Sequence, residues 1–363
     1  MNTCLITGAS GFIGRHLASA LSYDPNPWQL RLVGRNIDLL PANDGAARHS
    51  IGAIDGNTDW SGLLKGVDVV VHTAARVHML HDTATDALAR YRSTNTEGTL
   101  RLAHQAAAAG VQRLVFLSTI GIHGSGQNRP YRETDVPAPH SPYAQSKLDA
   151  ERGLLALAAH SGMEVVLIRP PLVYGWGAPG NFAKLAAIVR RGIPLPLGSV
   201  HNLRSLVGID NLVDFIQRCM THPAAANQAF LVSDGHDLST PALIQCMGTA
   251  LGQPVRLLPV PPALLHWGAA CVGKQAIVQQ LTATLQADTH KARALLAWAP
   301  PLTVDAGLSK ALSPQKPHET IARLVACISG QPAAGPATAG HRIVGTPDIA
   351  GPCTLLVAAG GSR

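Results

Sequence analysis

Three glycines near the amino terminus restrict what this chain can fold into more than any other feature. Gly8, Gly11 and Gly14 follow a short β-like run at residues 1–7 and precede residues 16–21, where apolar positions recur at helical spacing. This order predicts a strand, a tight glycine turn and a helix. Gly8 permits the turn, Gly11 lets the backbone approach a pyrophosphate, and Gly14 lets the helix pack on the strand. The helix N-terminus would offer N–H groups to phosphates, so the segment predicts a nucleotide site.

Beyond this opening, strand-like and helix-like segments alternate along the chain. Helical spacing is found at residues 91–109 and 143–160. The strand-like segments are mainly apolar, and they lie at 28–33, 67–72, 111–117 and 164–169. Alternation at these spacings is typical of βαβ units, so the sequence predicts an α/β protein with a doubly wound parallel sheet, the Rossmann-type fold.

The pattern changes after Arg169, where prolines and glycines multiply and the elements become shorter. We therefore predict a dinucleotide-binding domain over 1–169, a smaller irregular α/β substrate-binding region over 170–312, and an unstructured tail over 313–363. About 204–235 are expected to return to the main sheet. The elements predicted in the second region are helices at 181–191, 210–221 and 238–251 and strands at 204–207 and 229–232, with Asp210 as an N-cap and Ser239 near a helix start.

Composition narrows the classes of protein that fit. The 363-residue chain is 46% hydrophobic and 4% aromatic, with a net charge of +7. It has neither a block of like charges nor a basic stripe with interleaved aromatic residues, so a nucleic-acid partner is not expected. Its six cysteines form no CxxC pair, and no signal peptide opens the sequence. We therefore expect reduced thiols and a cytoplasmic protein.

The apolar stretch at residues 263–273 raises the question of a membrane segment. It is shorter than the roughly 20 residues of a membrane span, and it contains His266 and Trp267. A core helix or an interfacial helix is the expected structure, and no membrane span is predicted.

Two residues that lie one helical turn apart carry the strongest chemical signal. Tyr143 and Lys147 share one helix face, and Thr119 ends a predicted parallel strand, where the ligand crevice of such sheets opens. A tyrosine that acts near neutral pH needs its phenolate stabilised by about 4 kcal/mol. One ammonium at about 4 Å supplies about that much at an effective dielectric constant near 20. Thr119 would hydrogen-bond the substrate oxygen, and Tyr143 would move its proton.

Two further patterns concern the cofactor and metals. Arg35 follows the second strand, where NAD-specific sheets usually carry an acid, and a guanidinium there would suit the 2′-phosphate of NADP. The alternative is an exposed loop arginine. His78 and His81 have a metal-like HxxH spacing, but no third ligand follows in an obvious pattern, so no metal is expected.

The motifs taken together resemble the extended short-chain dehydrogenase/reductase superfamily, in its NAD-dependent epimerase/dehydratase branch of nucleotide-sugar enzymes. The resemblance covers about residues 1–312. It is carried by Thr7 to Gly14, His72 to Ala75, Asn95 to Thr99, Ser118-Thr119 with Gly124, Tyr143 to Lys147, Arg169-Pro170 with Tyr174-Gly175, and Arg204 to Asn211.

This resemblance implies a set of site residues. Thr119, Tyr143 and Lys147 would be catalytic, and Lys147 would also lower the pKa of Tyr143 and hold the nicotinamide ribose. The residues expected to bind NAD or NADP are Gly8, Ser10, Gly11, Phe12, Ile13, Gly14, Arg35, Ile54, Thr73, Ala74, Ala75, Asn95, Ser118, Tyr143, Lys147 and Pro170.

The resemblance also implies a UDP-sugar substrate. Asn181 and Phe182 would approach the sugar or uracil, and Arg204 would pair with the UDP phosphates. The sequence departs from the family pattern at Gly52-Ala53, where an aspartate usually follows the glycine, although Asp55 lies two residues on.

Within the branch, the sequence is similar to bacterial enzymes of O-antigen and capsule sugar synthesis that work at sugar C4. These are UDP-glucose or UDP-N-acetylglucosamine 4-epimerases and reductases of UDP-4-keto-6-deoxy-N-acetylhexosamines. Arg35 mildly favours a reductase. A dehydratase fits less well, since Ile120-Gly121 stand where dehydratases carry Asp-Glu. A non-catalytic dinucleotide-sensing regulator is the alternative from another class, and the family implies a homodimer.

Overall fold

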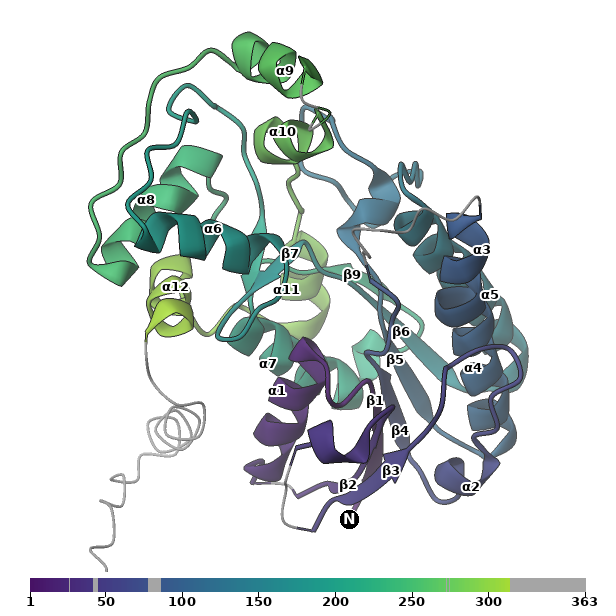
Figure 1. Cartoon of the computed structure of the whole chain (residues 1–363). Helices are drawn as coiled ribbons and strands as arrows, with labels where there is room; N and C mark the ends of the chain where they lie inside the picture. The colour runs from purple at the N-terminus through teal and green to yellow at the C-terminus, as the bar shows by residue number, and fades with distance from the viewer. Residues whose placement is uncertain (26, 42–44, 78–85, 272, 274, 314–363) are drawn as a thin grey trace, which may run out of the picture.

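A seven-stranded parallel sheet forms the centre of the protein (Figure 1). The structure, a computed structural model, describes residues 1–25, 27–41, 45–77, 86–271, 273 and 275–313. The strand order is β3-β2-β1-β4-β5-β6-β9, so the chain reverses direction across the sheet between β1 and β4. The strands are β1 (Thr3–Thr7), β2 (Gln29–Gly34), β3 (Ala47–Ser50), β4 (Val69–His72), β5 (Arg113–Leu117), β6 (Glu164–Arg169) and β9 (Ala229–Leu231). The predicted α/β fold with a doubly wound parallel sheet is confirmed.

Helices cover both faces of this sheet, which explains why its central strands read as nearly continuous apolar runs. Within β1, Cys4 and Ile6 face one buried cluster and Leu5 faces the other. The first cluster lies under α1 (Phe12–Ser22), α7 (Ile209–Thr221) and α11 (His290–Leu296). The second lies under α2 (Ser61–Leu64), α4 (Gly98–Ala108) and α5 (Pro142–Ser161). Figure 1 shows α1 and α7 on one side of the sheet and α4 and α5 on the other.

A smaller group of elements packs beyond the carboxyl ends of the central strands (Figure 1). It includes a two-stranded parallel sheet and has its own buried apolar cluster. Its strands are β7 (Leu172–Tyr174) and β8 (Leu206–Gly208), and its helices are α6 (Asn181–Arg190), α8 (Thr240–Leu251), α9 (Pro262–Cys271), α10 (Gln275–Thr282) and α12 (Val304–Leu312). Short 3₁₀ turns also occur: η1 (Ile37–Leu39), η3 (Ile120–His123) and η4 (Pro223–Ala225).

The sequence predictions for this second region hold in part. β9 pairs with β6, as expected for a strand that extends the main sheet, but β8 pairs with β7 instead. Ser239 caps α8 by accepting a hydrogen bond from the Ala242 amide. The prediction that Asp210 caps the next helix is wrong, because α7 begins at Ile209 with Gly208 as its cap. The Asp210 carboxylate accepts a hydrogen bond from Lys310 Nζ at 2.6 Å instead.

The helix predicted at 91–109 is longer and has an irregular centre. It consists of α3 (Ala87–Arg92), a π-helical turn η2 (Ser93–Glu97) and α4. The π turn carries Asn95, which is fully buried. Wide turns of this kind are rare and often mark functional positions, and the apolar spacing of the sequence carries no sign of one. The HxxH pair and all but the first residue of the predicted tail lie outside the described residues, at 78–85 and 314–363.

The turn after β1 depends on close backbone packing. Gly8 has a φ of +68°, and a Cβ on Gly14 would lie 2.3 Å from the Gly8 carbonyl oxygen. The helix α1 therefore approaches the end of β1 more closely than any other residue at position 14 would allow.

A buried chain of hydrogen bonds fixes the carboxyl ends of β1 and β4 to the helix beside them. Thr99 Oγ1 donates to the Asn95 carbonyl at 2.8 Å, so it must accept from His72 Nε2 at 2.9 Å. His72 Nδ1 then accepts from Thr7 Oγ1 at 2.6 Å. Burial, with a smaller effect of the Lys147 ammonium, lowers the pKa of His72 to about 3, so the imidazole is neutral and carries its proton on Nε2. No helix among the described residues is long and apolar enough to cross a membrane.

We expect Gly14→Ala to destabilise the protein by about 1–3 kcal/mol, because the added Cβ must push α1 away from the glycine turn. Gly62→Ala is the matched control, since a Cβ there meets no atom within 4 Å. Urea unfolding followed by circular dichroism measures both variants. Equal stabilities for the two alanine variants would contradict the close packing at position 14.

We expect stability to fall as the pH drops below 6.5, because the unfolded chain then protonates His72 while the folded protein does not until about pH 3. The expected slope from this residue is about 1.4 kcal/mol per pH unit. His72→Gln removes the titrating group, so its stability should depend less steeply on pH between 6.5 and 4. The exposed His104→Gln is the control. An unchanged slope in His72→Gln would show that the imidazole is not held neutral.

Candidate active site

The glycine turn at the end of β1 forms a cradle bounded by backbone. A Cβ on Gly8 would lie 2.7 Å from the Ala74 amide nitrogen, and one on Gly11 would lie 3.0 Å from the Gly8 carbonyl oxygen. Gly11 is the N-cap of α1, and the first turn of this helix contains no acidic residue. The cradle and the positive end of the helix dipole fit a dinucleotide pyrophosphate, which binds mainly to backbone amides.

The cradle lies between the ends of β1 and β4, where the order of the strands along the chain changes direction. Thr73 Oγ1 donates to the Thr7 carbonyl at 2.7 Å, and the Ala74 amide donates to Thr7 Oγ1 at 3.4 Å. These bonds hold residues 73–75 against the glycine turn. Ligands of doubly wound sheets bind at this kind of position.

Arg35 directly follows β2, the neighbour of β1, and is exposed. A Cβ on Gly34 would lie 3.3 Å from Ser10 Oγ, which places the end of β2 beside the glycine turn. The structure therefore puts Arg35 at the same edge as the cradle.

The Asp55 carboxylate accepts hydrogen bonds from the Asn57 amide at 2.9 Å and from Thr58 Oγ1 at 3.3 Å, so it stabilises the turn to which it belongs.

Ser118 and Thr119 leave β5 at the same edge of the sheet. Thr119 Oγ1 accepts a hydrogen bond from the Gly121 amide at 3.0 Å and so caps η3, which leaves its proton for another acceptor. Ser118 Oγ is buried and has no hydrogen-bond partner among the described residues. The Pro170 carbonyl accepts from the Ile120 amide at 3.0 Å, so the ends of β5 and β6 are held together here.

The helix α5 brings Tyr143 to this edge. Ser141 caps the helix by accepting from the Ala144 amide, and Pro142 occupies its first turn, so the helix begins immediately before the tyrosine. A Cβ on Gly121 would lie 3.3 Å from Thr119 Oγ1 and 3.8 Å from the Ala144 Cβ. The loop of Thr119 therefore packs on the first turn of α5, which brings together two of the three predicted catalytic residues.

Lys147 lies one turn further along and is 1% exposed. Its Nζ donates to the carbonyl of Leu117, the last residue of β5, at 2.7 Å and lies 4.3 Å from the centre of the Phe116 ring. Burial lowers the pKa of Lys147 to about 7, and the charge of Glu151 opposes this shift. The ammonium is thus anchored at the carboxyl edge of the sheet and close to losing its proton at neutral pH.

The pKa of the Tyr143 phenol shifts in the opposite direction to the one expected from the sequence. The Lys147 ammonium was expected to lower the pKa of the Tyr143 phenol, but burial, with a smaller contribution from Tyr91, raises it to about 12. The ring of Tyr143 meets that of Tyr91 edge-on, with the ring centres 6.1 Å apart. The lysine charge is directed at the Leu117 carbonyl, so it does not offset the desolvation of the phenol in this structure.

Asn95 connects the cradle edge to α5. Its Oδ1 accepts from the Arg76 amide at 2.8 Å, and its Nδ2 donates to Ser146 Oγ at 3.0 Å and to the Arg76 carbonyl at 3.1 Å. Ser146 Oγ in turn donates to the Tyr143 carbonyl at 2.8 Å. Ser146 and His72 are positioning residues that were not predicted from the sequence. They could have been found as buried polar positions beside predicted site residues.

Ile54, which was predicted to bind the cofactor, packs against Gly98 at the start of α4.

The three predicted substrate residues have different surroundings. Asn181 begins α6, is exposed, and donates through Nδ2 to Gln280 Oε1 at 3.1 Å. The Arg204 guanidinium donates to the carbonyls of Gln280 and Ala283, the latter at 3.2 Å, and burial lowers its pKa. Phe182 is 4% exposed, and its ring packs on Tyr174 with ring centres 5.7 Å apart. This differs from the expectation that Phe182 approaches the ligand, because its ring is part of the core.

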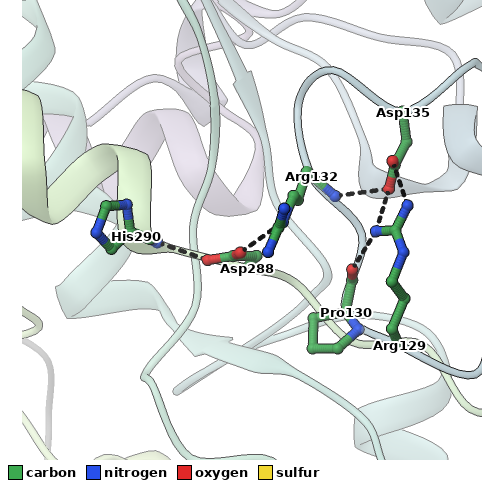
Figure 2. Close-up of polar contacts among 6 residues, drawn as sticks. All are labelled: Arg129, Pro130, Arg132, Asp135, Asp288 and His290. Carbon is green, nitrogen blue, oxygen red and sulfur yellow. Dashed lines mark hydrogen bonds and ion pairs between the residues drawn. The ribbon is translucent and has the colours of Figure 1, made fainter.

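The loop that follows Thr119 and η3 is fastened to the C-terminal part of the fold (Figure 2). Arg129 and Asp135 form a two-pronged ion pair within the loop, at 2.7 and 3.0 Å. Arg132 Nε donates to Asp288 at 3.1 Å, and the Tyr131 amide donates to the Gln286 carbonyl at 2.8 Å.

No cluster of three or more metal-ligating side chains occurs among the described residues.

Known proteins resemble this chain in sequence and in fold. The sequence pattern of the NAD dependent epimerase/dehydratase family matches residues 4–233. A UDP-glucose 4-epimerase of Vibrio cholerae is 43% identical over 309 residues, which cover 84% of this chain and 93% of that protein.

Two solved structures share the fold. UDP-glucuronic acid 4-epimerase from Bacillus cereus in complex with NAD has a TM-score of 0.70 at 21% identity, covering 89% of this chain and 99% of that one. RMD from Pseudomonas aeruginosa complexed with NADPH has a TM-score of 0.66 at 22% identity, covering 86% and 98%. With the family pattern and the Vibrio cholerae relative, the comparison shows that the chain belongs to the NAD dependent epimerase/dehydratase family.

Proposed function

We propose that the protein catalyses NAD(P)-dependent oxidation and reduction at C4 of a UDP-hexose or UDP-N-acetylhexosamine. The observation that carries this proposal is the common edge on which Thr119, Tyr143 and Lys147 lie beside the glycine cradle. The 43% identical relative from Vibrio cholerae, named a UDP-glucose 4-epimerase, supports the same chemistry.

Each of the three side chains has a proposed role. Tyr143 moves the proton of the C4 hydroxyl, and Thr119, whose proton is free to be donated, holds the same oxygen. Lys147 holds the nicotinamide ribose and stabilises the phenolate. When bound, the nicotinamide supplies the hydride acceptor and donor. Because burial raises the pKa of the phenol to about 12, Tyr143 needs positive charge nearby to ionise at neutral pH.

The dinucleotide is proposed to bind to residues 1–169 and the UDP-sugar to residues 170–312. The glycine cradle, residues 73–75 and Asn95 would surround the pyrophosphate and nicotinamide end, and Arg35 would reach the adenine ribose. Arg204 would contact the UDP phosphates, with Asn181 nearby. The N-terminus of α1, which has no side-chain cap and no acidic residue in its first turn, supports this placement.

Two C4 reactions remain in the proposal. An epimerase would keep one nicotinamide cofactor bound through the whole reaction, whereas a reductase would exchange NAD(P)H in each turnover. The Vibrio cholerae relative favours the epimerase, and the position of Arg35 favours a cofactor with a 2′-phosphate. A role in O-antigen or other surface polysaccharide synthesis and a homodimer also belong to the proposal. A dehydratase is disfavoured by Ile120-Gly121 after Thr119, and a regulator without catalysis by the intact set of three residues.

The proposed function is tested with UDP-glucose and UDP-N-acetylglucosamine and the purified protein, while the sugar signals are followed by NMR. Nucleotide released from the same protein by denaturation is identified in parallel. Interconversion of the C4 epimers with retained NAD supports the epimerase, and NADPH-dependent reduction of a UDP-4-keto sugar supports the reductase. Failure of both reactions would contradict the proposal.

We expect Tyr143→Phe to lower turnover by about 10²–10⁴-fold, because the substituted ring keeps the contact with Tyr91 but cannot transfer a proton. Binding of NAD, measured by calorimetry, should change little. Tyr91→Phe is the matched control and should keep its turnover. Equal turnover in Tyr143→Phe and the wild type would remove the phenol from the mechanism.

We expect Arg35→Gln to weaken NADP binding by about 10- to 100-fold, because a charge-assisted hydrogen bond contributes about 1.5–3 kcal/mol. NAD binding should be unaffected, since it carries no 2′-phosphate. The exposed Lys65→Gln at the end of α2 is the control. Parallel loss of NAD and NADP affinity, or no loss at all, would show that Arg35 does not read the 2′-phosphate.

A further inference from the structure

The helix α9 has the composition of a buried helix but lies on the surface. It contains no charged residue, and of its residues only Ala269 is buried. Trp267 is 71% exposed and Leu264, one turn earlier, is 58% exposed. The sequence of this stretch fits either a core helix or an interfacial helix, and the exposure of its side chains rules out the core. A surface helix normally turns charged residues to water, so an apolar outer face indicates a partner.

Neighbouring segments extend this apolar surface. α9 packs on α10, whose Ile277 is 55% exposed, and Figure 1 shows both helices at the end of the molecule opposite the amino terminus. The segment before α9 runs beside the loop after α6, because the Gly198 amide donates to the Leu258 carbonyl at 2.9 Å. Leu258 and Ile193 are each about half exposed. We call Ile193, Leu258, Leu264, Trp267 and Ile277 the α9–α10 face.

The sequence stretches that form this face carry charges of one sign. Neither residues 165–209 nor residues 238–287, which include every segment of the face, contain a single Asp or Glu. The same stretches carry the exposed basic residues Lys184, Arg190, Arg191 and Arg256. A second copy of the chain placed on this face would bring arginine against arginine. The basic charge of this face is instead complementary to an anionic surface.

We propose that the α9–α10 face docks the protein on a membrane surface that contains anionic phospholipid. Trp267 and Leu264 enter the headgroup region, as the apolar side of an interfacial helix does, and the flanking arginines contact lipid phosphates. Tryptophan suits this depth because its ring is apolar and its N–H remains polar. This docking concerns binding alone and does not depend on the proposed reaction.

Docking would place the sugar-nucleotide region next to the membrane. The C-terminal end of α10 is bonded to both residues proposed to bind the substrate: Gln280 accepts from Asn181 through Oε1 and from Arg204 through its carbonyl. A surface bound through α9 and α10 is thus continuous with the segment that holds these side chains. Under the proposed function, the reaction would occur beside the lipid surface.

The test is co-sedimentation of the full chain with vesicles of phosphatidylcholine alone or with 40% phosphatidylglycerol. We expect the wild type to bind the anionic vesicles at least about tenfold more strongly than the neutral ones, since each basic residue at the surface contributes roughly fivefold. The double variant Leu264→Ser/Trp267→Ser should lose at least tenfold in this partitioning. Leu39→Ser, which changes a leucine that is 67% exposed on η1, should bind as the wild type does.

A second variant separates the charge from the apolar contact. Arg190→Gln/Arg191→Gln should weaken binding to the anionic vesicles only. Circular dichroism and turnover in solution check that each variant is folded. Equal sedimentation with and without vesicles would overturn the proposal, as would vesicle binding that survives in Leu264→Ser/Trp267→Ser. An oligomer that this variant dissociates, without vesicle binding by the wild type, would show that the face joins two copies instead.

Discussion

The buried lysine at the end of β5 is the interaction on which the account of the site depends. Lys147 Nζ lies inside the protein, bonded to the Leu117 carbonyl and above the Phe116 ring. Burying an amine is costly, and the lowered pKa of about 7 is the result of that cost. A side chain held in such a position by one carbonyl and one ring is set up to respond to a ligand at the sheet edge, because any added charge changes its protonation.

The surrounding network holds α5 in register with the sheet. One chain of hydrogen bonds leads from Thr7 through His72 and Thr99 to Asn95, and a second leads from Asn95 through Ser146 to the Tyr143 carbonyl. Burial keeps the imidazole neutral, and the partners of Asn95 fix the orientation of its amide. The glycine cradle and the tyrosine are thereby parts of one polar core.

Much of the fold could be predicted from the sequence because it follows from periodicity. The β1–turn–α1 unit was recognisable from three glycines. The central strands were recognisable from continuous apolar runs, which are typical of a sheet that is covered on both faces. The start of α8 was recognisable from Ser239. The N-cap of α7 was not, since Asp210 is engaged by Lys310 from α12, a contact between residues distant in sequence. The π turn at Asn95 was also missed, because it leaves the apolar spacing unchanged.

For the site, the sequence indicated which residues gather but not their electrostatics. The four-residue spacing of Tyr143 and Lys147 predicted a shared face, yet the burial that raises one pKa and lowers the other depends on β5 and α3. Phe182 follows Asn181 directly, but helical geometry turns its ring into the core against Tyr174. The outward face of α9 was likewise unresolved, because composition does not tell which side of a helix is covered.

A crystal structure of the protein with NAD and a UDP-sugar tests the central claim most directly. The account predicts that the nicotinamide ribose lies within hydrogen-bonding distance of Lys147 Nζ and that the C4 oxygen of the sugar lies between Thr119 Oγ1 and the Tyr143 hydroxyl. A nicotinamide ring that points away from Tyr143, with the dinucleotide still on the glycine cradle, would contradict it.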